Sequence, residues 1–143
     1  MKTIAQVIEA KKGPVATVEA GDSVLNALRV MAERGIGAVL VTESGSLAGI
    51  FSERDYARKV VLQGKDSTST PVRDIMTSKL IHVTPEMTVD QAMQLMSEKR
   101  IRHLPVLDPA GRLIGVVSIG DMVKETIEYQ QFLIRQLESY IAS

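Results

Sequence analysis

Two serine–aspartate pairs are the residues whose types and spacing best indicate chemistry. The stretches GIFSERD and GVVSIGD each place an aspartate three positions after a serine, as Ser52–Asp55 and Ser118–Asp121. An ionised carboxylate only accepts hydrogen bonds, so it can accept one from each hydroxyl of a ribose diol. The unpaired N–H groups at the start of a helix also attract anions such as phosphate. The pattern therefore indicates a nucleotide site, and it occurs twice.

The same spacing also has a purely structural interpretation. Ser-x-x-Asp at the beginning of a helix resembles a capping box, in which the serine caps the helix and the acid reaches back to it. An acidic side chain in the first turn also suits the helix dipole. Both interpretations remain open at the level of the sequence.

An internal duplication explains why the pattern occurs twice. The segment from Thr17 to Asp55 aligns with the segment from His82 to Asp121. Such a repeat indicates two copies of one supersecondary unit. The identical apolar and acidic positions are Val18, Val24, Ala27, Met31, Glu33, Ile36 and Val41 in the first copy and Val83, Val89, Ala92, Met96, Glu98, Ile101 and Val106 in the second.

Each copy is predicted to be a β-α-β-β-α unit. In the first copy, VATV precedes a helix that begins at the capping residue Ser23 and ends at Gly35. Strands at 36–42 and 47–51 and a helix over 52–64 follow. The second copy has IHVT, a helix from Thr88, the strands HLPVLD and RLIGVV, and a helix from Ser118.

One such unit is too small to bury both faces of its sheet. We therefore expect a mixed α/β (α+β) fold, in which two repeats with pseudo-twofold symmetry pack their small sheets together between flanking helices. The predicted divisions are residues 1–68 for the first repeat with its lead-in, 69–127 for the second, and 128–143 for a C-terminal helical extension.

The predicted C-terminal helix carries a seam at alternating steps of four and three residues. This spacing is typical of packed helices, either between subunits or where a terminal helix folds back on its own domain. The seam positions are Val123, Ile127, Gln130, Ile134, Leu137 and Ile141.

Composition narrows the function classes. The chain has 143 residues, with 17 basic and 17 acidic side chains and no cysteine. A nucleic-acid partner is not expected without a basic excess, and disulfides or thiol chemistry are excluded. No apolar run approaches the roughly 18 residues that cross a bilayer, and the N-terminus lacks a signal-peptide pattern. A membrane partner is not expected, and the expected compartment is the cytoplasm.

The repeat order resembles a tandem pair of CBS (cystathionine-β-synthase) domains, known as a Bateman module. The resemblance rests on the duplicated β-α-β-β-α order, on HLPVLD, and on the pattern G-h-h-S-x-x-D that leads into the last helix. It extends from about Ile4 to Ile127. It implies a stand-alone, non-enzymatic module for regulation or energy sensing that binds AMP, ADP, ATP or NAD(H) in clefts between the repeats.

The resemblance also implies a homodimer and a regulated partner protein. Two alternatives stay open beside the nucleotide sensor. One is a module that binds S-adenosylmethionine, and the other is a structural dimerisation or interaction module that has no ligand.

The resemblance assigns contacts in both clefts. Asp55 and Asp121 would bind ribose hydroxyls, with Ser52 and Ser118 beside the ribose or phosphate. The adenine would occupy an apolar slot formed by Val15, Ala16, Thr17, Gly37 and Ala38 in the first repeat and by Ile81, His82, His103, Leu104 and Pro105 in the second.

The phosphates of a bound nucleotide would be held by cationic side chains or other hydrogen-bond donors. Arg54 and then Arg58 are the predicted donors in the first repeat, because a guanidinium offers paired N–H groups. Gly120 stands at the position of Arg54 in the second repeat, so the two clefts are expected to differ in affinity or ligand. The predicted donors there are Lys79, Arg100, Arg102 and His103, and Thr77 is also assigned to this cleft.

Catalytic and metal sites are not predicted. Neither serine lies in a G-x-S-x-G setting or has an evident base. The two histidines, His82 and His103, lack carboxylates at metal-ligand spacing. A catalytic cofactor is not expected either, because the chain has no P-loop and no G-x-G-x-x-G motif.

Overall fold

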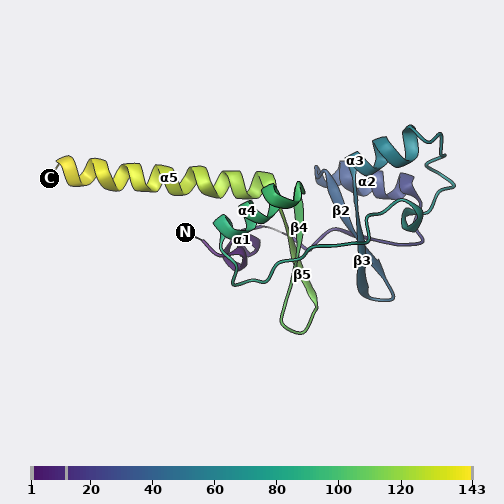
Figure 1. Cartoon of the computed structure of the whole chain (residues 1–143), viewed down its shortest axis with the longest axis horizontal. Helices are drawn as coiled ribbons and strands as arrows, with labels where there is room; N and C mark the ends of the chain where they lie inside the picture. The colour runs from purple at the N-terminus through teal and green to yellow at the C-terminus, as the bar shows by residue number, and fades with distance from the viewer. Residues whose placement is uncertain (1, 12, 143) are drawn as a thin grey trace. The chain divides into compact units, whose positions relative to one another are not determined.

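The chain folds into short helices and strands that alternate in the order set by the duplication (Figure 1). The computed structural model describes residues 2–11 and 13–142. It confirms the mixed α+β fold, with two small sheets and a long C-terminal helix. The elements are α1 (Ile4–Ala10), β1 (Thr17–Glu19), α2 (Val24–Arg34), β2 (Ala38–Glu43), β3 (Ser46–Ser52), α3 (Glu53–Asp55), α4 (Val89–Lys99), β4 (His103–Leu107), β5 (Leu113–Ser118) and α5 (Ile119–Ala142).

The two sheets differ by one strand. One sheet has the order β1-β2-β3, with β1 parallel and β3 antiparallel to β2, and the other is the antiparallel pair β4-β5. The expected strand IHVT is reduced to a single parallel bridge between Val83 and Val106. In the first repeat, Ala20 N extends the ladder by donating to Thr42 O. Pro85 stands at the equivalent position and has no N–H to donate, so the strand cannot lengthen there.

Helix ends follow the sequence signals. The Ser23 side chain accepts from Asn26 N at the start of α2, and Gly35 ends this helix in the left-handed conformation with φ of 63°. Thr88 forms a full capping box with Gln91 at the start of α4. Both helix starts are where the sequence predicts them.

The helix expected over 52–64 is not a regular α-helix. It begins as α3 and continues as a π-helix over Tyr56–Val61. In this wider winding Leu62 N donates to Ala57 O at 3.1 Å. Single-turn π segments of this kind are frequent near functional sites.

Each lead-in segment packs with the other repeat. The lead-in helix α1 joins the second repeat, where Ile4 N donates to Met87 O at 2.8 Å. The second lead-in, a 3₁₀ turn over Val72–Asp74, joins the first repeat, where Val72 N donates to Asp22 O at 2.8 Å. The compact units are therefore Met1–Gly13 with His82–Ser143, and Pro14–Ile81. They do not coincide with the predicted ranges 1–68 and 69–127.

Aliphatic side chains fill both interiors, and equivalent repeat positions are buried in both. Val24, Ala27 and Met31 of α2 are buried, as are their counterparts Val89, Ala92 and Met96 of α4. Phe51 is the largest fully buried side chain of the Pro14–Ile81 unit and is 0% exposed. The duplicated apolar pattern thus forms two separate small cores.

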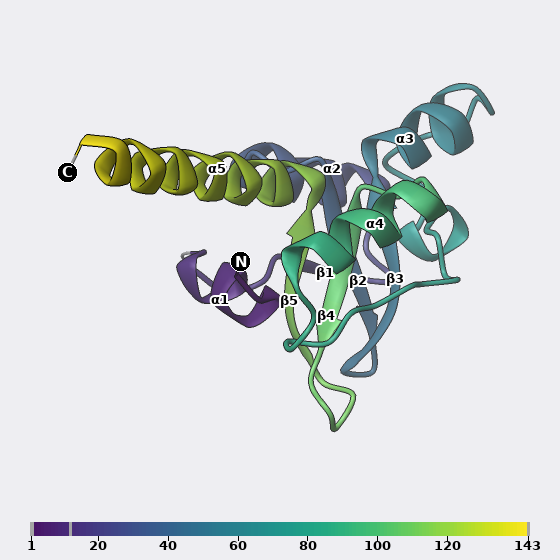
Figure 2. The ribbon, with the colours of Figure 1, turned by 60° about the vertical axis from the view of Figure 1, so that its left-hand side comes forward.

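Helix α5 is much longer than the others and has 24 residues. Figures 1 and 2 show that it extends past α4 and the β4–β5 hairpin. Its first turns pack on the unit through Met122, which is 0% exposed. Within residues 2–11 and 13–142, no helix has the length and apolarity to cross a membrane.

The last strand of each repeat has a glycine where the lead-in segment of the other repeat packs closely against it. A Cβ at Gly115 would lie 2.8 Å from Cγ2 of Ile8 in α1. A Cβ at Gly49 would lie 2.7 Å from Met76 Sδ and 2.8 Å from the backbone oxygen of Thr77. All three distances are shorter than a real Cβ shows, so a larger residue at either position would force its neighbours to shift.

We predict that Gly49→Ala lowers the free energy of unfolding by about 1–3 kcal/mol, the usual cost of overpacking. The Thr77 carbonyl cannot move aside, because its oxygen accepts from Ile50 N at 2.9 Å. Urea unfolding measures the effect. Gly21→Ala is the matched control, since its nearest neighbour would be Arg73 Nη2 at an ordinary 3.8 Å. Equal stability of the two variants would contradict the close-packing argument.

Candidate functional site

Strand pairing places the predicted residues of the first repeat at one end of its sheet. The register of β2 and β3 sets Ala38 opposite Ser52. Just beyond this pair, Glu53 N donates to Gly37 O at 3.1 Å. Because β1 is parallel to β2, the chain enters β1 at this same end. The predicted adenine-slot residues 15–17 and 37–38 therefore lie at the sheet end that carries Ser52.

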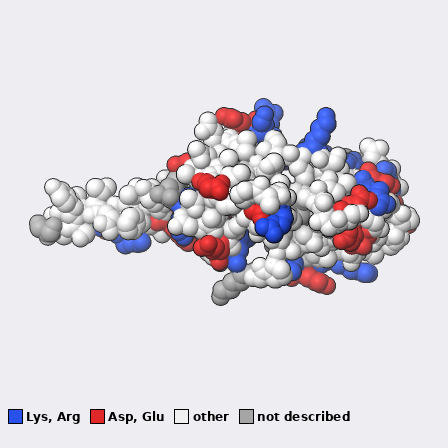
Figure 3. Space-filling model, turned by 90° about the horizontal axis from the view of Figure 1, so that it is seen from below, with Lys and Arg blue, Asp and Glu red and all other residues white. Residues whose placement is uncertain are grey.

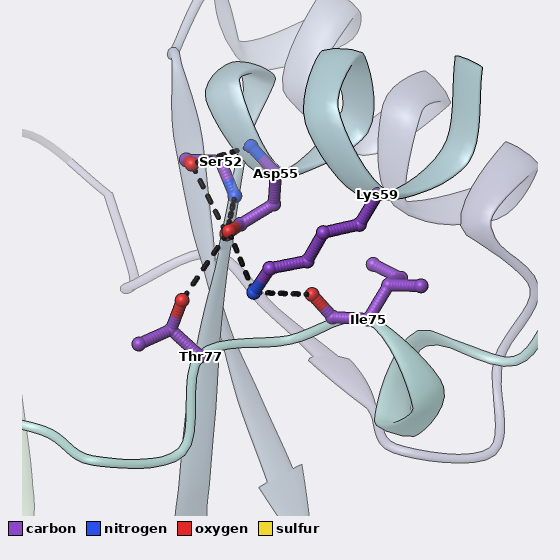
Figure 4. Close-up of polar contacts among 5 residues, drawn as sticks. All are labelled: Ser52, Asp55, Lys59, Ile75 and Thr77. Atoms are coloured by element: carbon purple, nitrogen blue, oxygen red, sulfur yellow. Dashed lines mark hydrogen bonds and ion pairs between the residues drawn. The ribbon is translucent and has the colours of Figure 1, made fainter. Parts of the chain in front are cut away.

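Asp55 has hydrogen-bond or ion-pair partners on both carboxylate oxygens (Figure 4). Oδ2 accepts from Ser52 N at 3.0 Å and from Ser52 Oγ at 3.1 Å. Oδ1 accepts from Thr77 Oγ1 at 3.3 Å and lies 3.1 Å from Lys59 Nζ. Ser52 Oγ also accepts from Asp55 N, which completes a capping box. The residue is only 8% exposed, so the carboxylate is held by the protein itself.

Two of these partners depart from the sequence interpretation. Lys59, which also donates to Ile75 O at 3.3 Å, was not among the predicted donors. Its i,i+4 spacing from Asp55 is a signal that could have revealed it. Thr77 was grouped with the second repeat, but the structure places it on Asp55 in the Pro14–Ile81 unit. The exchange of lead-in segments is the reason.

Asp121 lies in the first turn of α5 and forms similar hydrogen bonds with Ser118, but its side chain is more exposed than that of Asp55. Oδ2 accepts from Ser118 N at 2.9 Å and from Lys11 Nζ at 2.8 Å, and Asp121 N donates to Ser118 Oγ at 3.1 Å. Both of the accepted hydrogen bonds fall on Oδ2. The Asp121 side chain is 25% exposed, against 10% for Asp55. The second carboxylate can therefore accept further hydrogen bonds.

The cation beside Asp121 comes from the lead-in helix segment. In the second repeat Glu125 stands where the first repeat has Lys59, and Glu125 pairs instead with Lys2 at 3.2 Å. Lys11 lies 110 positions from Asp121 in the sequence and also donates to Val116 O at 3.0 Å. No local spacing could have indicated this pair.

Lys11 favours the ionised form of Asp121. Burial by itself would raise the pKa of the Asp121 carboxyl. The hydrogen bond and positive charge of Lys11, with the backbone N–H of Ser118, outweigh burial and hold the pKa below the ordinary aspartate value. The carboxylate is therefore an acceptor for hydroxyl groups throughout the neutral pH range.

The other predicted residues of the second repeat divide between the two units. His103 lies opposite Ser118 in the β4–β5 pair, and Ile119 N donates to Arg102 O at 2.8 Å. Leu104 and Pro105 are buried within β4. Lys79 and Ile81 fold with the Pro14–Ile81 unit, whereas His82 belongs with the second repeat.

The side chains predicted to bind phosphate are mostly exposed. The guanidinium-bearing residues Arg54 and Arg58 lie in the first turns after β3, and Gly120 occupies the position equivalent to Arg54 at the start of α5. Exposure leaves such groups able to meet a ligand. The exposed members of this predicted set are Arg54, Arg58, Lys79, Arg100 and Arg102.

Comparison with known proteins identifies the family. Residues 6–62 and 72–128 each match the family model of the CBS domain. The chain belongs to the CBS domain family. This confirms the resemblance seen in the sequence, including its tandem arrangement.

Relatives share the fold and much of the sequence. The CBS domain-containing protein CBSX3, mitochondrial, of Arabidopsis thaliana is 47% identical over 125 residues, which cover 84% of this chain and 60% of that protein. The chain thus spans about three-fifths of that relative's length. A solved protein with CBS domains from Burkholderia ambifaria MC40-6 is 49% identical, with a TM-score of 0.83, and the match covers 89% of this chain and 95% of that one.

A more distant structure contains a ligand. The CBS domain protein PAE2072 from Pyrobaculum aerophilum, solved in complex with AMP, is 26% identical with a TM-score of 0.74. The match covers 83% of this chain and 88% of that protein. In that relative the shared fold accommodates an adenine nucleotide.

We predict that Lys11→Met raises the pKa of Asp121, because burial remains while the stabilising charge is lost. A carboxyl group whose pKa is lower in the folded state than in the unfolded state stabilises the fold. This stability is fully present above the unfolded pKa of about 3.9, and it is lost as the pH falls through the lower pKa of the folded state. The variant should therefore lose this part of its acid-range pH dependence. Carbon-13 NMR titration of the carboxyl group measures the pKa.

Lys59→Met is the matched control for this titration. It removes the equivalent charge from Asp55, in the other unit, and should leave the pKa of Asp121 unchanged. An unaltered pKa in Lys11→Met would show that the Lys11–Asp121 pair does not exist in solution.

Proposed function

We propose that this chain is a non-enzymatic regulatory module that binds an adenine nucleotide, with Asp121 as the residue that accepts the ribose hydroxyls. One observation carries the proposal. Asp121 is an ionised carboxylate at the start of a long helix, and the hydrogen bonds from Ser118 N and Lys11 Nζ both fall on Oδ2.

The surroundings of Asp121 suit a nucleotide. The start of α5 attracts anions through its dipole. The ammonium group of Lys11 lies 2.8 Å from the carboxylate and can turn to a phosphate, because its side chain is 42% exposed. His103 lies opposite Ser118 at the adjoining sheet end, where the base is proposed to bind. Sugar, phosphate and base each therefore have a proposed contact.

AMP is the ligand that we propose first. The AMP complex of the Pyrobaculum aerophilum relative supports an adenine nucleotide. ADP, ATP, NAD(H) and S-adenosylmethionine carry the same ribose diol, so the Asp121 contact does not distinguish among them. Their discrimination would depend on the cations that meet the phosphates.

The two repeats are proposed to bind with unequal affinity. A ribose at Asp55 would have to displace Thr77, Lys59 or the capping bonds of Ser52, since these groups already use both carboxylate oxygens. A ribose at Asp121 can use Oδ1 without breaking the cap. We therefore propose the second repeat as the stronger site and Asp55 as mainly structural.

A structural dimerisation module is the second candidate function. The capping bonds at Ser52 and Ser118 favour it, since they show that both pairs stabilise helix starts. We propose that a homodimer forms in either case. Regulation of a partner protein additionally requires that the ligand bind one conformation of the chain more tightly than another.

We predict that AMP binds the wild-type chain and that Asp121→Asn weakens binding by about tenfold to 100-fold. That range corresponds to the loss of a charge-assisted hydrogen bond, about 1.5–3 kcal/mol. Asparagine can still accept from Ser118 N, so the helix cap is retained. Isothermal titration calorimetry with AMP, ATP, NADH and S-adenosylmethionine measures affinity and ligand choice.

Asp90→Asn is the matched control, because it removes the same charge from the first turn of another helix, α4. It should bind AMP as the wild type does. Failure of all four ligands to bind the wild-type chain would overturn the sensor and favour the structural module.

We also predict that Asp55→Ala lowers the free energy of unfolding by about 1–3 kcal/mol, because it removes the carboxylate half of the capping box and the partner that Thr77 Oγ1 and Lys59 Nζ share. AMP affinity should change little. Urea unfolding and calorimetry test the two parts separately. A loss of affinity as large as that of Asp121→Asn would instead place the nucleotide at the first repeat.

A further inference from the structure

The outer part of α5 exposes an apolar stripe. Every described residue from Ile127 to the end of the helix is exposed, and the projecting end of the molecule in Figure 3 shows mainly uncharged atoms on the face in view. Soluble proteins seldom leave a stripe of this kind uncovered. The large apolar side chains exposed along α5 are Val123, Ile127, Tyr129, Phe132, Leu133, Ile134, Leu137, Tyr140 and Ile141.

The stripe has the period of a two-helix seam. Val123, Ile127, Gln130, Ile134, Leu137 and Ile141 alternate steps of four and three, which are the a and d positions of a heptad. A helix segment of this length is only marginally stable in water without a packing partner. The regular spacing favours another helix as that partner over an irregular surface.

The charges disfavour a membrane surface. Amphipathic helices that lie on membranes are rich in lysine and arginine on their polar face. Over residues 127–142, α5 has two acidic side chains, Glu128 and Glu138, and one basic side chain, Arg135. Anionic lipid would therefore not be attracted.

The charges beside the seam are complementary when two copies run antiparallel. Setting Ile127 opposite Leu137 of a second copy aligns every seam position, with Val123 opposite Ile141 and Gln130 opposite Ile134. In this register Lys124 faces Glu138 of the second copy, and the twofold symmetry forms the pair again at the other end. In a parallel pair Lys124 and Glu138 lie two heptads apart and cannot meet.

We propose that α5 pairs antiparallel with α5 of a second copy of this chain. The seam residues form the interface, and the two Lys124–Glu138 pairs set its direction. The seam does not include Asp121 or Asp55, so the interface and the proposed nucleotide site use different residues.

The interface residues can be tested without disturbing the fold, since they are exposed. Leu137→Glu should raise the dimer dissociation constant at least 100-fold, as measured by analytical ultracentrifugation. Phe132→Glu is the matched control, because Phe132 is similarly exposed but lies on the opposite side of the helix from the seam. An unchanged dissociation constant for Leu137→Glu, or a monomeric wild type, would overturn the proposal.

Charge exchange tests the direction. Lys124→Glu alone should weaken the dimer, because it sets two glutamates against each other at both ends. Adding Glu138→Lys should restore the affinity. A double variant that is no tighter than the single one would overturn the antiparallel register.

Cross-linking gives an independent answer, because the chain has no cysteine. The double variant Ile127→Cys/Leu137→Cys should form covalent dimers under mild oxidation, whereas Ile127→Cys alone should not. Absence of cross-linking in the double variant would overturn the proposal. Cross-linking of Ile127→Cys alone would also overturn it, since that residue meets its own counterpart only in a parallel pair.

Discussion

The close approach of each lead-in segment to a strand glycine is the constraint on which the structure depends. Ile8 of α1 lies against Gly115, and Met76 and Thr77 lie against Gly49. These contacts join each lead-in to the repeat that it does not precede in the sequence. They also place Lys11 beside Asp121 and Thr77 beside Asp55. One packing requirement therefore determines both the compact units and the neighbours of the two carboxylates.

The two carboxylates show how equivalent positions acquire different roles. Lys59 supplies a cation to Asp55 from its own helix, whereas its counterpart Glu125 cannot, so Asp121 depends on Lys11. Both aspartates cap helices, and at Asp121 capping leaves one oxygen for another partner. Capping and ligand binding are therefore compatible at the second repeat, although the sequence presented them as alternatives.

Helix α5 adds an element that the duplication lacks. Its first turns contribute to the core through Met122 and to the candidate site through Asp121. Its outer part carries the seam and is exposed. A single helix thus carries both the proposed ribose-binding residue and a surface that is suited to a second copy.

The local features of this protein could be predicted from its sequence, because they depend on neighbours along the chain. The repeat, the family, the helix caps at Ser23 and Thr88, and the pairing of Ser52 with Asp55 follow from short-range spacing. Only the tertiary structure decided which repeat each lead-in joins, why IHVT is not a full strand, and which cation meets Asp121. The reason is physical: Lys11 and Asp121 are 110 positions apart, and the packing of Ile8 on Gly115 that brings them together has no periodicity to reveal it.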